Sequence, residues 1–125
     1  MLYDHIDLRV SSLAKVRELY DALLPAMGFS RLEQDDEDVN YHRPQPDRSG
    51  PFFGLMQDSQ HRPNGTRTAF RANSRSEVDR LAQIAHEAGA RAFEPPAPYS
   101  AESPSYYAAF FEDADGNKLE ICFRE

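Results

Sequence analysis

The sequence predicts an α+β fold built from two copies of one strand–helix–strand–strand–strand (βαβββ) module. The strands are expected to form a curled mixed sheet that encloses a ligand cup, with the helices on its outer face. A shift of 62 residues lays the second half of the chain on the first, carrying Ser12 onto Ser74 and Val16 onto Val78. Each half opens with a strand-like segment followed by an amphipathic helical pattern. A module repeated in this way pairs with its own copy, and helices on one side of a sheet leave the other side open to a ligand.

The first half begins with a strand and a helix. Residues 2–10 alternate between apolar and polar side chains over most of their length, as in a half-buried strand. Ser11 and Ser12 offer an N-cap for a helix that reaches about Met27, and Pro25 and Gly28 mark its end. The buried stripe of this helix is expected to hold residues spaced three or four apart, namely Leu13, Val16, Leu19, Tyr20, Leu23, Leu24 and Met27.

The rest of the first half is predicted as three strands. They cover residues 29–34, 39–43 and 51–57. An acidic turn at 35–38 and a proline-rich loop at 43–50 separate them, and the polar stretch 58–65 is the best candidate for a link between the halves.

The second half repeats the opening pattern. Residues 66–72 are expected to form a strand, and Ser74 and Glu77 form a capping box for a helix that runs to Ala88. The predicted buried stripe of this helix is Val78, Leu81, Ala82, Ala85 and Ala88. Another strand starts at 91–93, and residues 94–104, with four prolines, are predicted as a loop.

A hairpin closes the chain. Residues 106–112 and 118–124 are the expected strands, and residues 113–117 supply the turn, with Gly116 able to take a positive φ. Glu120 lies at the centre of the second strand, where a carboxylate needs a cation, a metal or water to stay charged.

The alternation sorts the strand side chains into two faces. The helices are expected to cover Ile6, Leu8, Val10, Phe70 and Ala72. The opposite face collects ionisable residues, namely His5, Asp7, Arg9, Arg67, Arg71 and Glu120. So many ionisable groups do not suit a packed core, so this face is expected to meet water or to line the cup.

Composition restricts the class of protein. A chain of 125 residues is predicted to be a single domain, with one module at about 1–60 and the other at about 64–125. The net charge of −7 argues against nucleic acid and anionic membranes as partners. No apolar run is long enough for a membrane span, and the residues after Met1 resemble a strand rather than a secretion signal. The single Cys122 cannot form an internal disulfide, so we expect a cytoplasmic protein.

The chain resembles the vicinal oxygen chelate superfamily in its repeat, in its opening DHIDLRVSSLAKVRELYDALLPAMGF, in the TAFRA segment before a capped helix, and in YYAAFFEDADGNKLEI. That superfamily includes glyoxalase I, bleomycin and fosfomycin resistance proteins and extradiol dioxygenases. The resemblance implies paired βαβββ modules that form a cup, often completed by a second chain. A homodimer that binds a small-molecule ligand is therefore expected.

The resemblance also implies where a metal would be held. The first-strand His ligand matches His5, and the Glu ligand of the last strand matches Glu120. The ligand that opens the second module, usually a His, falls on Arg67, and a further Glu would fall at 54–56, where no side chain is a donor. The turn departs from the family pattern as well, with Ala114 where Pro is usual.

Arg67 decides between two interpretations. A guanidinium stays protonated and has no lone pair, so beside a dication it is repulsive. The preferred interpretation is a metal-free cup in which Arg67 pairs with Glu120 or binds an anionic ligand. The alternative is a weak or displaced Zn, Ni, Mn or Fe ion held by His5, Glu120 and a further donor.

Other residues are candidates for ligand binding. Arg9 and Arg71 are either solvated strand charges or partners of a substrate carboxylate, and His42 is a candidate to point into the cup. Tyr106 and Tyr107 are adjacent, so they should face opposite sides of the sheet, and the one that faces the cup either packs there or hydrogen-bonds a ligand.

Three functions stay open. The first is a glyoxalase-like lyase, isomerase or dioxygenase that uses a metal held by His5 and Glu120 to polarise a small oxygenated substrate. The second is a non-catalytic protein that sequesters a small molecule. The third is a metal-free enzyme in which Arg67 is the electrophile and Glu120 or His5 is the base.

Overall fold

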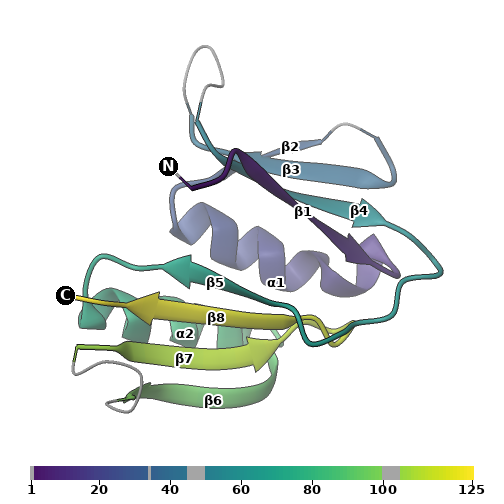
Figure 1. The fold of residues 1–125 in the computed structure, drawn as a ribbon. Coiled ribbons are helices and arrows are strands. Elements are labelled where there is room, and N and C mark those ends of the chain that lie inside the picture. Colours follow the sequence, from purple (N-terminus) through teal and green to yellow (C-terminus); the bar gives the residue numbers. More distant parts are fainter. Residues whose placement is uncertain (1, 34, 45–49, 100–104) are drawn as a thin grey trace. The chain divides into compact units, whose positions relative to one another are not determined.

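The computed structural model describes residues 2–33, 35–44, 50–99 and 105–125, and it contains two helices and eight strands (Figure 1). The chain separates into two compact units, one ending at Arg62 and the other starting at Pro63. Each unit has one helix and one four-stranded sheet. The predicted α+β class and the paired βαβββ modules are therefore confirmed, with the strands in two mixed sheets.

In the first unit, α1 covers one face of a four-stranded sheet (Figure 1). Its elements are β1 (His5–Val10), α1 (Leu13–Ala26), β2 (Ser30–Glu33), β3 (Asp38–His42) and β4 (Phe52–Gln57). The strand order is β1-β4-β3-β2, with β1 parallel to β4 and the other pairs antiparallel. The strand predicted at 2–10 begins only at His5, because Leu2 (95% exposed) and Tyr3 (48% exposed) lie outside the sheet.

The second unit repeats this arrangement. Its elements are β5 (Arg67–Arg71), α2 (Arg75–Glu87), β6 (Arg91–Pro98), β7 (Tyr107–Glu112) and β8 (Lys118–Phe123). The strand order is β5-β8-β7-β6, again with one parallel pair, β5 with β8. β1 and β5 occupy the same place in their sheets, and so do β4 and β8. The predicted repeat is thus confirmed element by element.

The helices bury the stripes that their spacing predicts. Leu13, Val16, Leu19, Tyr20, Leu23 and Leu24 are buried on α1, and Val78, Leu81, Ala82 and Ala85 are buried on α2. Only the last predicted member of each stripe, Met27 and Ala88, is half-buried. Among the described residues, no helix is long and apolar enough to cross a bilayer.

The helix N-termini differ between the repeats. Ser74 Oγ accepts a hydrogen bond from the Glu77 backbone N–H at 3.0 Å, and Glu77 Oε1 accepts one from the Asn73 N–H at 2.9 Å. The Ser74 cap of the predicted capping box is confirmed there, whereas Glu77 accepts from Asn73, the residue before the N-cap, rather than from Ser74. Ser12, at the same place before α1, makes no side-chain capping bond.

One prediction about the second unit is wrong. Residues 94–98, expected in a loop, continue β6 as far as Pro98. Prolines are tolerated because β6 lies at the sheet edge and its pairing with β7 shifts register twice. Ala92, near the first shift, takes φ = 49°, an uncommon value for a residue other than glycine. The other residues of that predicted loop, 100–104, lie outside the described residues, as do 34 and 45–49.

The closing hairpin is confirmed together with its turn. Asp113 is fully buried, and its carboxylate accepts hydrogen bonds from the Asp115 N–H (2.9 Å), the Asn117 N–H (3.0 Å) and the Asn117 side-chain amide (3.0 Å). Gly116 takes φ = 96°. This turn sets the register in which Phe110 lies opposite Glu120.

Candidate functional site

Each sheet has one face covered by its helix and one open face. The first open face is defined by alternate residues of three strands, in the register rows His5–Phe52–His42, Asp7–Gly54–Asn40 and Arg9–Met56–Asp38. On β1 the members of these rows are exposed, whereas Ile6, Leu8 and Val10 are more buried. The predicted division of the β1 side chains is therefore confirmed.

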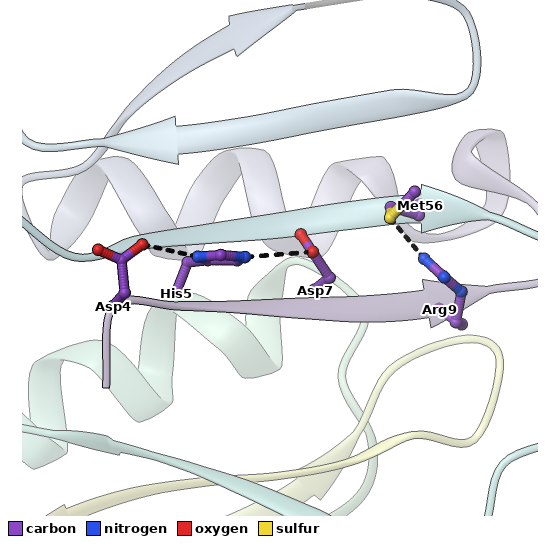
Figure 2. Close-up of polar contacts among 5 residues, drawn as sticks. All are labelled: Asp4, His5, Asp7, Arg9 and Met56. Carbon is purple, nitrogen blue, oxygen red and sulfur yellow. Dashed lines mark hydrogen bonds and ion pairs between the residues drawn. The ribbon is translucent and has the colours of Figure 1, made fainter. Parts of the chain in front are cut away.

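His5 lies between two carboxylates on the first open face, as Figure 2 shows. Its Nδ1 atom is 2.7 Å from Asp4 Oδ1, and its Nε2 atom is 3.5 Å from Asp7 Oδ2. The hydrogen bond to Asp4 raises the pKa of the imidazole above its ordinary value of 6.5. Its side chain is 42% exposed, so His5 is an accessible base or cation.

Three rings stack side by side in the first row of this face. The ring centroids of His5 and Phe52 are 4.5 Å apart with an interplanar angle of 7°, and those of His42 and Phe52 are 4.6 Å apart. The structure therefore places His42, a predicted candidate, on the same face as His5. Phe52 was not predicted as a site residue, because its place beside His5 follows from the pairing of β1 with β4.

Polar side chains fill the other two rows of the first open face. Asp7 and Asn40 flank Gly54, and Asn40 is only 9% exposed. Arg9 donates from Nη1 to the sulfur of Met56 (Figure 2). The candidate Arg9 is thus held along the sheet surface by its neighbour on β4.

The second open face carries Arg67, Arg71 and Glu120. Ala69 of β5 pairs with Glu120 of β8, and Glu120 pairs with Phe110 of β7, so the alternate residues of these three strands share one face. The members of this face are Arg67, Ala69 and Arg71 on β5, Lys118, Glu120 and Cys122 on β8, and Ala108 and Phe110 on β7. Leu119 and Ile121 of β8 point the other way and are fully buried. The structure therefore brings Arg67 and Glu120 to the same side of one sheet.

Arg67 stacks on an aromatic ring. Its guanidinium carbon lies 4.8 Å from the centroid of Phe110. A hollow of about 110 Å³ opens beside it, lined by Arg67, Ala92, Glu94, Phe110, Phe111, Glu112 and Lys118. The ion pair predicted between Arg67 and Glu120 stays a prediction.

Glu120 is 6% exposed, so its carboxylate lies in a largely dry environment. Burial, followed by the negative charge of Glu120, raises the pKa of the Cys122 thiol. A thiol with a raised pKa is a poor nucleophile.

The two adjacent tyrosines face opposite sides of the sheet, as predicted. Tyr107 turns towards α2, where its hydroxyl donates to Asp79 at 2.6 Å. Tyr106 lies on the other side, 6% exposed, with the guanidinium carbon of Arg124 4.1 Å from its ring centroid. Of the two candidates, Tyr106 is the one that belongs to the second open face.

Tyr99 is a member of this aromatic group that the sequence analysis missed. Its ring meets Phe110 edge-on at 5.2 Å and lies 6.5 Å from Tyr106. The proline-rich stretch was expected to be a loop, so the strand that brings Tyr99 to its partners was not foreseen. The same wrong loop prediction hid Glu94, which lines the hollow.

These residues do not fit a four-ligand metal centre. Arg67 has no lone pair to give, and β4 offers only Gly54, Leu55 and Met56 where a further carboxylate ligand is expected. Within the described part of either unit, no group of three or more His, Cys, Asp or Glu side chains could hold a metal ion.

Comparison with known proteins agrees with the fold. The family described as "Glyoxalase/Bleomycin resistance protein/Dioxygenase superfamily" matches residues 2–121. A glyoxalase/bleomycin resistance protein from Albidiferax ferrireducens T118 is 25% identical over all of both chains, with a TM-score of 0.81. A glyoxalase-related enzyme from Fulvimarina pelagi is 17% identical over 99% of this chain and 88% of its own, with a TM-score of 0.75.

A third structure, a glyoxalase/bleomycin resistance protein/dioxygenase family enzyme from Burkholderia phytofirmans PsJN, has a TM-score of 0.74 at 15% identity, covering 98% of this chain and 100% of its own. No match was found among curated proteins. At these identities the likeness of the last two structures concerns the fold alone.

Proposed function

Because this chain belongs to the glyoxalase/bleomycin resistance protein/dioxygenase superfamily, we propose that it binds a small oxygenated anion, such as a carboxylate, on the second open face. Arg67 is the residue that holds the anion, and no resident metal takes part. Binding, rather than chemistry, is the proposed activity. A sequestering protein needs a shaped polar site but no metal and no base.

The stacking of Arg67 on Phe110 carries this proposal. A guanidinium that lies over a ring still has its N–H donors in its own plane, directed outward, where a carboxylate can take two of them. Stacking also restricts the side chain before the ligand arrives, so less conformational entropy is lost on binding.

The hollow beside Arg67 sets the size of the ligand. Its volume is about 110 Å³. It therefore accepts a very small molecule, or the anionic end of a larger one. Lys118 adds a second cation, while Glu94 and Glu112 on the same wall balance the charge. The affinity for a carboxylate is then expected to depend on N–H hydrogen bonds from Arg67 more than on the net charge of the hollow.

Titration calorimetry with acetate, pyruvate and lactate, each paired with a neutral amide or alcohol of similar shape, tests the proposal. Arg67→Ala should weaken carboxylate binding by about 10- to 150-fold, the range for a lost charge-assisted hydrogen bond. Arg71→Ala is the matched control, because Arg71 lies on the same strand and face but does not line the hollow. Equal binding by the wild type and Arg67→Ala contradicts the proposal.

Metal analysis of protein purified without chelators is the second test. About one equivalent of Zn, Ni, Mn or Fe per chain would contradict the metal-free part of the proposal. Arg67→His restores a donor at that position. A gain of metal by this variant supports the correspondence between Arg67 and the usual His ligand, and no gain counts against it.

A homodimer is also part of the proposal. Each four-stranded sheet has two edge strands, and strand edges are common places for self-association. Light scattering at micromolar concentration measures the mass directly, and a monomeric mass contradicts the dimer.

A further inference from the structure

We propose that the hollow beside Arg67 is selective for a small zwitterion, an amino acid whose carboxylate binds the cations of the hollow and whose ammonium group binds its carboxylates. The inference rests on the proposed anion binding at Arg67 and adds the second charged group of the ligand. Two cations, Arg67 and Lys118, and two carboxylates, Glu94 and Glu112, line the hollow. Their formal charges cancel, so a ligand without net charge leaves the hollow neutral, whereas a simple carboxylate adds one uncompensated negative charge.

A β-bulge in the edge strand β6 shapes one wall of the hollow. Along β6, the step from Arg91 to Glu94 covers three residues. Their partners on β7, Glu112 and Phe110, are only two residues apart. The extra residue of a bulge is left out of the strand ladder and bends the strand. Ala92 lies within this bulge at φ = 49° and lines the hollow. The corresponding strands of the first unit, β2 and β3, pair in one continuous register, so the bulge distinguishes the second unit from the first.

The charges of the hollow are separated along the strand order of the sheet. The cations lie on two neighbouring strands, Arg67 on β5 and Lys118 on β8, where they are paired residues. The carboxylates lie on the next two strands, Glu112 on β7 and Glu94 on β6 (Figure 1). Neighbouring strands are only about 4.8 Å apart, so an anion bound at the cations comes close to the carboxylates. A positive group on the same ligand replaces that repulsion with attraction.

Phe110 lies between the two kinds of charge. The guanidinium carbon of Arg67 is 4.8 Å from the centroid of its ring, and its cross-strand partner on β6 is Glu94. Phe110, Phe111 and Ala92 supply the apolar part of the lining. Apolar walls with a few charged groups at fixed places are typical of small-molecule sites. An amino acid has the matching arrangement, because a short carbon segment joins its anion to its cation.

The volume of the hollow limits the ligand to short side chains. About 110 Å³ suits glycine or alanine better than a large amino acid. Glu94 is exposed, so solvent screens its attraction for an ammonium group. We therefore expect a Kd on the order of 1 mM.

The test compares L-alanine with L-lactate, which share a carbon skeleton and a carboxylate but differ in carrying an ammonium or a hydroxyl group. Amide NMR titrations of the full chain at low ionic strength give the Kd of each ligand. Alanine should produce saturable shifts at the amides of residues 67, 94 and 112. Lactate, which lacks the positive group, should bind about 10-fold more weakly. Ethylammonium, which lacks the carboxylate, should also bind about 10-fold more weakly than alanine.

Glu94→Gln separates this inference from the proposed anion binding. The change keeps the side-chain size and should weaken alanine binding about 10-fold without weakening lactate binding. Because Glu94 is exposed on an edge strand, the variant should fold like the wild type. Glu87→Gln is the matched control, because it makes the same change on α2, and Glu87 does not line the hollow. Its affinity for alanine should stay within about twofold of the wild type.

The possible results distinguish the inference from the proposed function. If alanine and lactate bind equally and both lose affinity in Arg67→Ala, anion binding holds and selectivity for a zwitterion is refuted. An unchanged alanine affinity in Glu94→Gln refutes it as well. Ethylammonium binding as tight as that of alanine means that the hollow recognises a cation alone. If neither alanine nor lactate gives saturable shifts, the proposed function is wrong and the inference falls with it.

Discussion

Removing the Asp113 carboxylate should destabilise the protein more than any other single change to a turn. Asp113→Ala deletes a fully buried acceptor of three hydrogen bonds at 2.9–3.0 Å, two of them from backbone N–H groups. Hydrogen bonds to charged groups contribute about 1.5–3 kcal/mol each, but bonds that share one carboxylate are not additive. Desolvation of that carboxylate offsets part of the gain. We expect a loss of about 3 kcal/mol in the free energy of unfolding.

Urea denaturation followed by far-UV circular dichroism measures this loss. With a slope of about 2 kcal/mol per molar urea, the midpoint should fall by about 1.5 M. Asp58→Ala is the matched control, because Asp58 also accepts from the N–H two residues later, at 2.9 Å, but in an exposed turn. Its cost should stay below about 0.5 kcal/mol. If the two variants lose equal stability, the buried turn does not hold the hairpin that carries Glu120.

Three further changes test individual contacts. NMR titration of His5 should give a pKa above 6.5, and Asp4→Asn should lower this pKa. Protonation of His5 stabilises the folded protein fully at a pH below 6.5, and this stabilisation is lost as the pH rises through the raised pKa of the folded state. Tyr41→Phe should cost about 1–2 kcal/mol of unfolding free energy, because the hydroxyl of this buried residue donates to the Asp21 carboxylate at 2.7 Å. Tyr107→Phe removes a hydroxyl bond that is exposed and should cost under about 0.5 kcal/mol. Equal costs for the two variants would contradict the role of burial. Ser74→Ala should lower the free energy of unfolding, measured by urea denaturation, by about 1 kcal/mol. Ser12→Ala should lower it less, because Ser12 makes no side-chain capping bond to α1.

The fold was largely predictable because its signals are local and occur twice. Helix stripes, a helix cap and an Asp-rich turn with glycine each follow from neighbouring residues, and the repeat supports the strand and helix order with a second copy. The prediction failed at β6, where three prolines outweighed all other local signals. Whether a strand can hold prolines depends on its place at a sheet edge, which no local pattern reveals.

The candidate site was predictable only in part, for a different reason. Alternation within each strand correctly placed His5 and Arg67 on open faces, because side chains alternate strictly along a strand. It gave no information on which strands become neighbours. The contacts of Phe52 with two histidines and of Phe110 with Arg67 depend on pairing between strands separated in sequence.

The duplicated scaffold presents different chemistry in its two halves. His5 and Arg67 occupy equivalent positions, yet one lies between carboxylates and the other over a ring. Gly54 of β4 and Glu120 of β8 also occupy equivalent positions, because Gly54 pairs with Asp7 on β1 and Glu120 pairs with Ala69 on β5. The first half therefore offers acceptors and a titratable imidazole, while the second offers a fixed cation and a buried carboxylate. Arginine has no lone pair to give to a metal, so the place of Arg67 on the second open face supports the proposed binding of an anion by direct hydrogen bonds.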